Sequence, residues 1–469
     1  MEGMSGSPLD LLPELILVLG AVAALLLGLW TPQSRQVRAG VVAALAALGS
    51  AVASASMLGS GRVVYGGTWT VDDAAGVARL TITLATAAVI VLASSSLRGH
   101  PRQTEAYVLM LLGATGAMVL AAASDLLMLV AGYLLASVPL YALAGFRKDD
   151  RGVEATLKYY LMGAFAGVLM LLGVAALVLA AGATDYANLG AGLPAAPVPL
   201  VAVGVVGLLA GVGFKAGVVP VHFWVPDVTA GTTPAIAAFL TTIPKIGAAV
   251  AAFRLVRDPL SGIALDVPLV VAVIAAASMT LGNLAAFQQQ EVLRLLGYST
   301  VSQVGYLFMV VAVAARTDLA LPALAIYLAG YAVTNIGAFA AAAALPQART
   351  LAQWAEASRG QPGLVLSLVV VLLGLVGTPP TAVFVAKLAV FSAAADGAMG
   401  WLVVLAAVNT VASLFYYLRW FGPAVRRSSP TSSNTRVLRS LPLLTAHTAA
   451  VASLLLGMGA GAWLALVVA

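Results

Sequence analysis

The sequence has no cysteine, little histidine and few charged residues. Its 469 residues include three histidines, and charged residues make up 9% of the chain, where a soluble domain carries roughly a quarter. The missing cysteines exclude disulfides, cysteine-ligated iron–sulfur clusters and zinc–thiolate sites, and so few histidines exclude a cytochrome that stacks haems. The composition excludes a soluble fold and favours a chain that moves something across a membrane without redox chemistry of its own.

Long apolar segments make up most of the sequence. The chain is 61% hydrophobic and its mean hydropathy is +1.02, and a membrane-crossing helix needs about 20 apolar residues. The runs predict an all-α polytopic membrane protein, one membrane domain over residues 1–469. Its fourteen predicted helices lie near 11–30, 39–57, 74–97, 104–123, 125–145, 155–181, 198–222, 231–255, 262–285, 298–315, 319–345, 362–395, 400–421 and 441–468.

The basic residues orient these helices. Of the 24 lysines and arginines, fifteen fall in loops on one side, and four fall on the other, namely Arg62, Arg254, Arg257 and Arg316. Cytoplasmic loops of membrane proteins are enriched in Lys and Arg, so the first set is predicted to be cytoplasmic. With an even number of helices, both termini then lie on the extracytoplasmic side. The net charge of +6 includes no basic run of the kind that binds nucleic acid.

Four of the five lysines fall in or at the ends of predicted helices, namely Lys158, Lys215, Lys245 and Lys387. An ionisable group inside a membrane is costly and is usually kept for function. Burial favours the neutral amine, so a lysine can load and release a proton, whereas arginine stays charged. The alternative is that a lysine near a helix end extends its ammonium to the headgroups. That alternative stays open chiefly for Lys158.

Prolines next to two of these lysines predict broken helices. Pro220 follows Lys215 in the seventh helix, and Pro379 and Pro380 precede Lys387 in the twelfth. Proline removes a backbone hydrogen bond and disfavours helical geometry in the residue before it. Interrupted helices in corresponding positions indicate an ion pathway; an ordinary kink is the alternative. The five-helix offset predicts two inverted repeats, helices 4–8 (about 104–255) and 9–13 (about 262–421), with helices 1–3 and 14 peripheral.

Three further residues are candidates for a proton path. His222 and Asp227 are predicted at the cytoplasmic end of the seventh helix, where they would form a mouth for protons. The alternative is a capping role in the turn that opens the eighth helix. Glu154 lies one helical turn before Lys158, where its carboxylate would hold that lysine charged.

The motifs around these lysines resemble a known family. The stretch 213–227 with Thr233, Pro234, Ala235 and Lys245 is similar to the core signature of the antiporter-like membrane subunits of respiratory complex I and of multisubunit cation/proton antiporters. Other motifs resemble the subunit N branch of bacterial NADH-quinone oxidoreductase. These motifs are the opening 12–15, Glu154 to Tyr160, Gly282 to Leu284, Arg294 to Ser299, Gly305 with Tyr306, and the closing Tyr416-Tyr417-Leu418-Arg419.

The resemblance implies fourteen helices with breaks in helices 7 and 12, in a bacterial cell membrane. It also implies proton translocation driven by quinone reduction elsewhere in the complex. Lys215, Lys245 and Lys387 match the family's relay lysines, and Lys158 matches its helix 6 lysine. The implied partners are other membrane-arm subunits, lipid, protons and water. NADH, flavin, iron–sulfur clusters and quinone would belong to other subunits, and this chain would hold no cofactor and no metal.

One position departs from the family pattern. The family has a glutamate in helix 5 paired with the helix 7 lysine, and aligning Ser137 and Pro139 with the family motif puts Leu134 there. Loss of that carboxylate would leave Lys215 without a counter-charge. Two alternatives to the leading hypothesis therefore stay open. One is a cation/proton antiporter subunit with no electron-transfer partner, and the other is a divergent complex I paralogue with impaired pumping.

Overall fold

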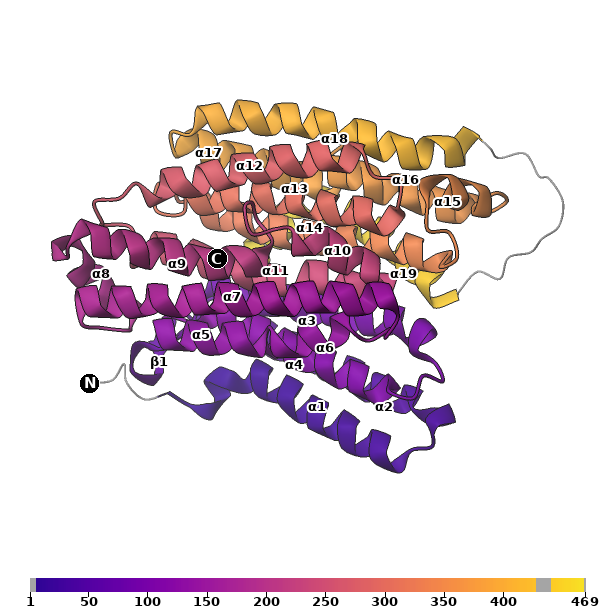
Figure 1. Ribbon diagram of the computed structural model, residues 1–469, viewed down its shortest axis with the longest axis horizontal. Helices are drawn as coiled ribbons and strands as arrows, with labels where there is room; N and C mark the ends of the chain where they lie inside the picture. The colour runs from indigo at the N-terminus through magenta and orange to yellow at the C-terminus, as the bar shows by residue number, and fades with distance from the viewer. Residues whose placement is uncertain (1–5, 427–439, 468–469) are drawn as a thin grey trace.

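The computed structural model describes residues 6–426 and 440–467, which form a bundle of helices with roughly aligned axes (Figure 1). Its helices are α1 (Leu12–Trp30), α2 (Val37–Ala55), α3 (Asp73–Leu97), α4 (Gln103–Ala122), α5 (Leu126–Leu135), α6 (Val138–Ala144), α7 (Asp150–Ala181), α8 (Tyr186–Gly192), α9 (Val198–Ala216), α10 (Trp224–Gly231), α11 (Pro234–Arg257), α12 (Val267–Phe287), α13 (Val292–Ala312), α14 (Ala320–Ala344), α15 (Leu351–Ala357), α16 (Pro362–Val376), α17 (Ala382–Asp396), α18 (Gly400–Arg426), α19 (Ser440–Met458) and α20 (Ala460–Val467).

The predicted membrane fold is confirmed. Within the described residues, 13 helices are long and apolar enough to cross a membrane, with α5 and α6 counted as one. The pair α16 and α17 supplies the remaining predicted crossing, because its two halves are separated by a break. The short helices α8 and α15 and one small sheet were not predicted. The sheet is a hairpin of β1 (Arg62–Val64) and β2 (Trp69–Val71), antiparallel with Arg62 opposite Val71.

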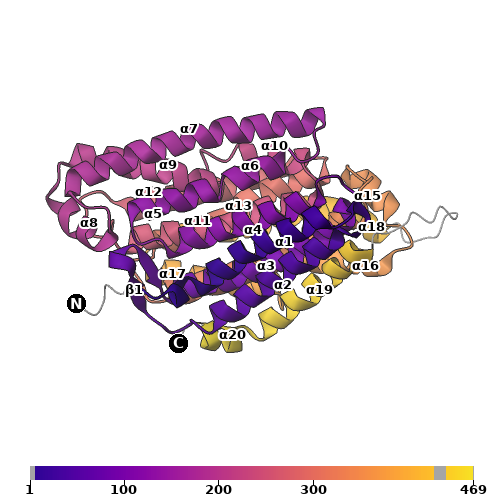
Figure 2. The ribbon, with the colours of Figure 1, turned by 90° about the horizontal axis from the view of Figure 1, so that it is seen from below.

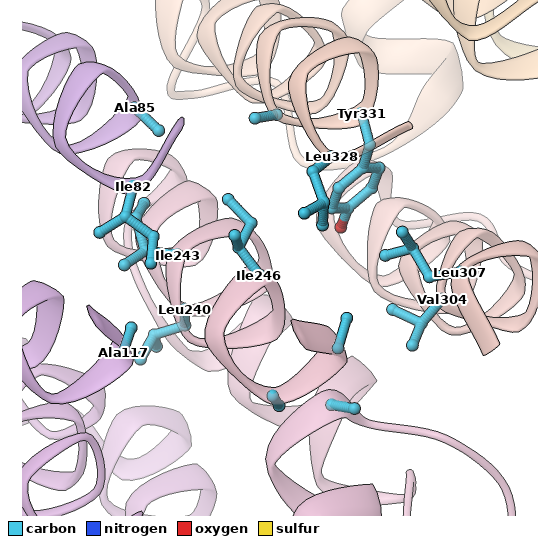
Figure 3. Close-up of a cluster of buried hydrophobic side chains, with 14 of the residues drawn as sticks. Ile82, Ala85, Ala117, Leu240, Ile243, Ile246, Val304, Leu307, Leu328 and Tyr331 are labelled. Carbon is cyan, nitrogen blue, oxygen red and sulfur yellow. The ribbon is translucent and has the colours of Figure 1, made fainter. Parts of the chain in front are cut away.

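Three helices form the centre of the bundle. The apolar segments of α11, α13 and α14 are 94–100% buried, whereas those of α18 and α19 are 33% buried. A helix that is apolar all round belongs inside, and one with an exposed apolar face borders lipid. Figure 3 shows how Ile243 and Ile246 of α11 face side chains from α3 and α14. The central helices therefore place anything polar on them far from both water and lipid.

Two helices break inside the bundle in the same way. Gly217 (φ +79°) directly follows α9, and Gly377 (φ +90°) directly follows α16. Both have a left-handed conformation, which glycine adopts without steric cost. In each case a cis X–Pro bond follows three residues later, at Pro220 and at Pro380. The chain then resumes as α10 and α17. The predicted breaks in helices 7 and 12 are confirmed.

Helix 5 also breaks, although it was predicted as one run from 125 to 145. It divides into α5 and α6 at Ala136 and Ser137. Pro139 lies at the start of α6, where a proline fits because its missing N–H would be unpaired there anyway. This third break lies beside α9, because the Lys215 side chain of α9 contacts it.

Candidate functional site

The last carbonyl of α9 is held by a lysine from a neighbouring helix. Lys245, in the middle of the fully buried part of α11, donates from Nζ to the Ala216 carbonyl at 2.6 Å. Its ammonium also lies 5.3 Å from the centre of the Trp224 ring. The final carbonyls of a helix have no intrahelical partner and carry partial negative charge. The break therefore supplies a binding place for a buried cation.

Lys215 lies one residue before that carbonyl and reaches the break in helix 5. Its Nζ donates to Ser137 Oγ at 2.6 Å and to the Ala136 carbonyl at 3.3 Å. The rings of Tyr133 and Tyr141 lie 4.9 and 6.0 Å from the same nitrogen. Lys215 and Lys245 thus both lie at the end of α9, each against a carbonyl beside a helix break.

The second break repeats the arrangement of the first. Lys387 of α17 donates from Nζ to the Val376 carbonyl, the last of α16, at 2.9 Å. It also reaches Thr410 Oγ1 of α18 at 3.2 Å and lies 4.0 Å from the centre of the Tyr306 ring. In both breaks the residue before the left-handed glycine offers its carbonyl to a lysine that is at most 3% exposed.

Buried polar side chains occupy the space between the two breaks. On the side of the first break, Thr241 lies one helical turn before Lys245, and its carbonyl accepts from Tyr331 Oη of α14 at 2.7 Å. Asn335 of α14 donates to Thr241 Oγ1 at 3.1 Å and to Thr242 Oγ1 at 2.9 Å. The Oδ1 atom of Asn335 is buried and has no hydrogen-bond partner among the described residues.

On the side of the second break, the polar groups come from α14, α13 and α18. Tyr327, one turn before Tyr331, donates to Gln303 Oε1 at 2.6 Å. Gln303 in turn donates to the Leu375 carbonyl at the end of α16 at 2.8 Å. Tyr306 Oη lies 2.9 Å from Thr410 Oγ1, the hydroxyl that contacts Lys387. A polar strip, defined as Thr241, Tyr331, Tyr327, Gln303, Tyr306 and Thr410, therefore lies between Lys245 and Lys387. Its members are hydrogen-bonded in pairs, Thr241 with Tyr331, Tyr327 with Gln303 and Tyr306 with Thr410.

The sequence reasoning did not identify this strip as a feature of the site. A signal was present in 299–306, where serines, Thr300, Gln303 and Tyr306 interrupt an apolar run that becomes α13. These residues alone did not show that α13 is a central helix. The polar residues of α13 could be recognised as part of a buried strip only when the structure showed α14 packed against them.

The three central lysines have no carboxylate partner among the described residues. None of Lys215, Lys245 and Lys387 belongs to an ion pair there. Leu134, where the family pattern places a glutamate, is 50% exposed, whereas the adjacent Tyr133 is buried. Helix-end carbonyls, hydroxyls and aromatic rings are thus the only polar surroundings that the described residues give these ammonium groups.

A charged cluster lies at one end of α7 and α10. Lys158 Nζ lies 2.7 Å from Glu154 Oε1 and 3.0 Å from Asp227 Oδ2. Asp227 Oδ1 accepts from Arg294 at 2.7 Å, and Arg151 lies 3.1 Å from Glu291. The Lys158 side chain is 47% exposed. The structure brings Lys158 and Glu154 together as the spacing predicted, and it assigns Asp227 to this cluster and not to a cap.

His222 lies elsewhere than predicted. It is in the break between α9 and α10, not at the cytoplasmic end of the seventh helix, because that helix continues as α10 to Gly231. Its ring is partly buried, and Nδ1 has no hydrogen-bond partner in the structure. The cap that opens α11 is Thr233, whose Oγ1 accepts from the Ile236 amide.

Two ion pairs, one of them buried, also escaped the sequence reasoning. Arg79 of α3 donates to Glu14 of α1 at 2.7 Å, and both side chains are almost fully buried. Arg254, predicted in a loop, lies in the last turn of α11 and binds Asp72 with two hydrogen bonds of 2.8 and 2.9 Å. The second pair ties the start of α3 to the helix that carries Lys245. A charged residue inside an apolar run was the available signal for Arg79.

Comparisons with known proteins show the family to which the chain belongs. Residues 123–413 match the family model described as NADH:quinone oxidoreductase/Mrp antiporter, transmembrane. The chain is 51% identical to NADH-quinone oxidoreductase subunit N 1 of Streptomyces griseus, covering 98% of each chain. It is 48% identical to NADH-quinone oxidoreductase subunit N of a Mycobacterium species, covering 97% of each.

Solved structures show the same fold. The chain is similar to one in respiratory complex I from Thermus thermophilus with bound aureothin, at 31% identity and a TM-score of 0.81, covering 97% of this chain and 98% of that one. It is also similar to a chain of the Mrp complex from a Dietzia species, at 20% identity and a TM-score of 0.82, covering 98% and 96%. At that identity the second likeness shows the fold alone.

Proposed function

Because the chain belongs to the NADH:quinone oxidoreductase/Mrp antiporter family, in the subunit N branch of the NADH-quinone oxidoreductases, we propose that it is a proton-translocating membrane subunit of such an enzyme. Its partners are then the neighbouring membrane-arm subunits, in the cell membrane of a bacterium. NADH, flavin, iron–sulfur clusters and quinone act in other subunits, and this chain moves protons in response.

The observation that carries the proposal is the pair of lysine-capped helix breaks with the polar strip between them. Lys215, Lys245 and Lys387 are the stations of the relay, and water and hydroxyl groups pass the proton between them. A lysine held only by carbonyls and hydroxyls retains an ammonium at high cost, so small changes in its surroundings shift its protonation. Reorganisation at a helix break is a change of that kind.

The ends of the path follow from the charges. The cluster of Lys158, Glu154 and Asp227 forms the cytoplasmic entrance, and His222, in the first break, passes protons on from it. Lys387 releases the proton to the outside. The basic loops face the cytoplasm, so both termini lie on the extracytoplasmic side. The shared pattern of a left-handed glycine, a proline three residues later and a lysine-capped carbonyl supports inverted repeats at about 104–255 and 262–421.

The proposal is tested by replacing Lys245 with Met in the assembled complex. Inverted membrane vesicles report proton uptake by fluorescence quenching while quinone reduction is followed separately. The expected result is a loss of proton uptake with normal assembly. Lys148→Met is the matched control, because Lys148 is exposed in the loop before α7. Proton uptake in Lys245→Met equal to that of the control contradicts the relay.

Affinity purification in mild detergent, followed by mass spectrometry, tests the assembly. Recovery of quinone-site and iron–sulfur subunits supports the oxidoreductase. Recovery of small antiporter subunits alone would make the chain part of a cation/proton antiporter. The similarity to the Dietzia chain shows a shared fold and does not favour this alternative.

A further inference from the structure

A hollow of about 290 Å³ opens at the arginine-rich end of the bundle, where α3 and α14 end and α11 and α13 begin. It is lined by three arginines against one carboxylate, Glu291. Its hydroxyl-bearing residues include Thr233, the cap that opens α11, and two serines near the end of α3. The polar lining on which the argument depends is Ser95, Ser96, Arg147, Arg151, Thr233 and Arg349.

The positive charge of this arginine hollow is not neutralised by its own ion pairs. Arg151 pairs with Glu291, and Arg147 pairs with Asp149. Arg349 is exposed and belongs to no ion pair among the described residues. The start of α11 adds the partial positive charge of a long helix. The hollow is therefore suited to a phosphate group.

A second hollow, of about 270 Å³, lies between α3, α14, α19 and α20. Figure 2 shows α3, α19 and α20 next to one another on one side of the bundle. Its lining is almost entirely apolar and includes Leu84, Ala88, Val333, Ile336, Leu456 and Trp463. Because it lies along membrane-spanning helices, it is suited to a hydrocarbon chain.

The two hollows share one face of α3. Leu84 and Ala88 line the apolar hollow, and Leu92 and Ser95 line the arginine hollow. The successive spacings of these four residues are four, four and three, which places them on one side of the helix. From Leu84 to Ser95 the rise is about 17 Å, close to half of the roughly 30 Å hydrocarbon thickness of a bilayer. Leu84 itself is 45% exposed, so lipid reaches this face.

We infer that an anionic phospholipid binds along α3, with its phosphate in the arginine hollow and one acyl chain in the apolar hollow. Basic pockets between membrane helices attract anionic headgroups, and the spacing along α3 matches one leaflet. The inference depends on charge and shape and does not require the proposed proton relay. It assigns to the ends of α3 and α14 a bound lipid that links them to α19 and α20.

Native mass spectrometry of the full-length chain, purified in mild detergent, tests this inference. The protein is stripped of lipid and then incubated with palmitoyl-oleoyl phosphatidylglycerol or with the phosphatidylcholine of the same chains. Wild-type protein is expected to retain the phosphatidylglycerol selectively. Arg349→Gln is expected to lower its retention about fivefold, the effect of one basic side chain near an anionic surface, and Arg349→Lys is expected to restore it. Arg359→Gln, another exposed arginine outside both hollows, is the control.

The acyl-chain part is tested by filling the apolar hollow. Ala88→Leu displaces about two methylenes and is expected to lower retention about tenfold. Ala23→Leu, on the exposed face of α1, is expected to have no effect. Three outcomes would overturn the inference. Wild type could retain both lipids equally, Arg349→Gln could behave like Arg359→Gln, or Ala88→Leu could behave like Ala23→Leu.

A competition with sodium phosphate distinguishes a lipid from a free anion. If phosphate displaces phosphatidylglycerol equally from wild type and from Ala88→Leu, the site binds a free anion, and the inference is overturned.

Discussion

The two helix breaks hold their lysines in the same manner but surround them differently. Among the residues that the structure describes, Lys245 has one hydrogen-bond partner, the Ala216 carbonyl, and it lies in the fully buried centre of the bundle. Lys387 has two, the Val376 carbonyl and Thr410 Oγ1, and the residue next to it, Leu388, is 49% exposed. The first break therefore depends on one carbonyl, whereas the second has a hydroxyl that both donates and accepts. This difference suits proton exchange at Lys245, in the middle of the bundle, and proton release at Lys387, beside an exposed residue.

The largest expected effect comes from removing either lysine and then both. If the two breaks are stations of one path, Lys245→Met and Lys387→Met each lower proton uptake by about tenfold or more, because a buried proton carrier has no substitute. The double variant is then no worse than either single one. Quenching assays on inverted vesicles, normalised to quinone reduction, measure this. Half the uptake remaining in each single variant would instead indicate two independent paths.

The next effect distinguishes the two glycines. Alanine at Gly217 or Gly377 costs roughly 1–2 kcal/mol, because both have the left-handed conformation. A Cβ at Gly217 would meet Lys245 Nζ itself, whereas one at Gly377 would lie 3.0 Å from Lys387 Cδ, a methylene that can shift. Both variants are expected to melt at lower temperature in detergent, and only Gly217→Ala is expected to lose proton uptake.

Equal loss of uptake in Gly217→Ala and Gly377→Ala, at equal melting temperatures, would contradict this difference. It would show that the two breaks respond to strain alone and that the position of the ammonium in the first is not critical. Gly182→Ala supplies the control for the backbone cost. Gly182 has φ +71° after α7 and nothing lies within 4 Å of an added Cβ.

The sequence could predict the breaks because their cause is local. Pro220, Pro379 and Pro380 disfavour helical geometry in the residue before each of them, and the lysines are visible as charges in apolar runs. The break at Ser137 had the same kind of signal in Pro139. It was missed because residues 125–145 form a run long enough for one uninterrupted crossing.

The partners of the lysines could not be predicted, because they come from other helices. The Ala216 carbonyl and Lys245 are 29 residues apart, and only the packing of α9 against α11 brings them together. The polar strip likewise needs α13, α14 and α18 in place. The hairpin at 62–71 escaped because its strands have three residues each, too few to show alternation. The role of Leu134 stays a prediction from the family pattern.

A smaller effect compares the hydroxyl partners. Thr410→Val removes one of the two Lys387 contacts and keeps the side-chain shape. Ser137→Ala removes the 2.6 Å contact of Lys215 and leaves the Ala136 carbonyl at 3.3 Å. A hydrogen bond to a charged group contributes about 1.5–3 kcal/mol, but a second partner remains in each case. We expect proton uptake to fall about threefold in both. If Thr410→Val takes up protons at the wild-type level, the Thr410 hydroxyl has no role in proton release.

The smallest effect is expected at the charged cluster. Lys158→Gln removes an ammonium that is 47% exposed and lies between two carboxylates. Water reaches this place and substitutes for a missing proton carrier, as it does not at Lys245. Surface ion pairs also contribute little to stability. Proton uptake in Lys158→Gln is therefore expected to stay within about twofold of that in Lys148→Gln. A loss as large as that of Lys245→Met would mean that water does not enter the cluster in the assembled complex, and that a partner subunit covers it.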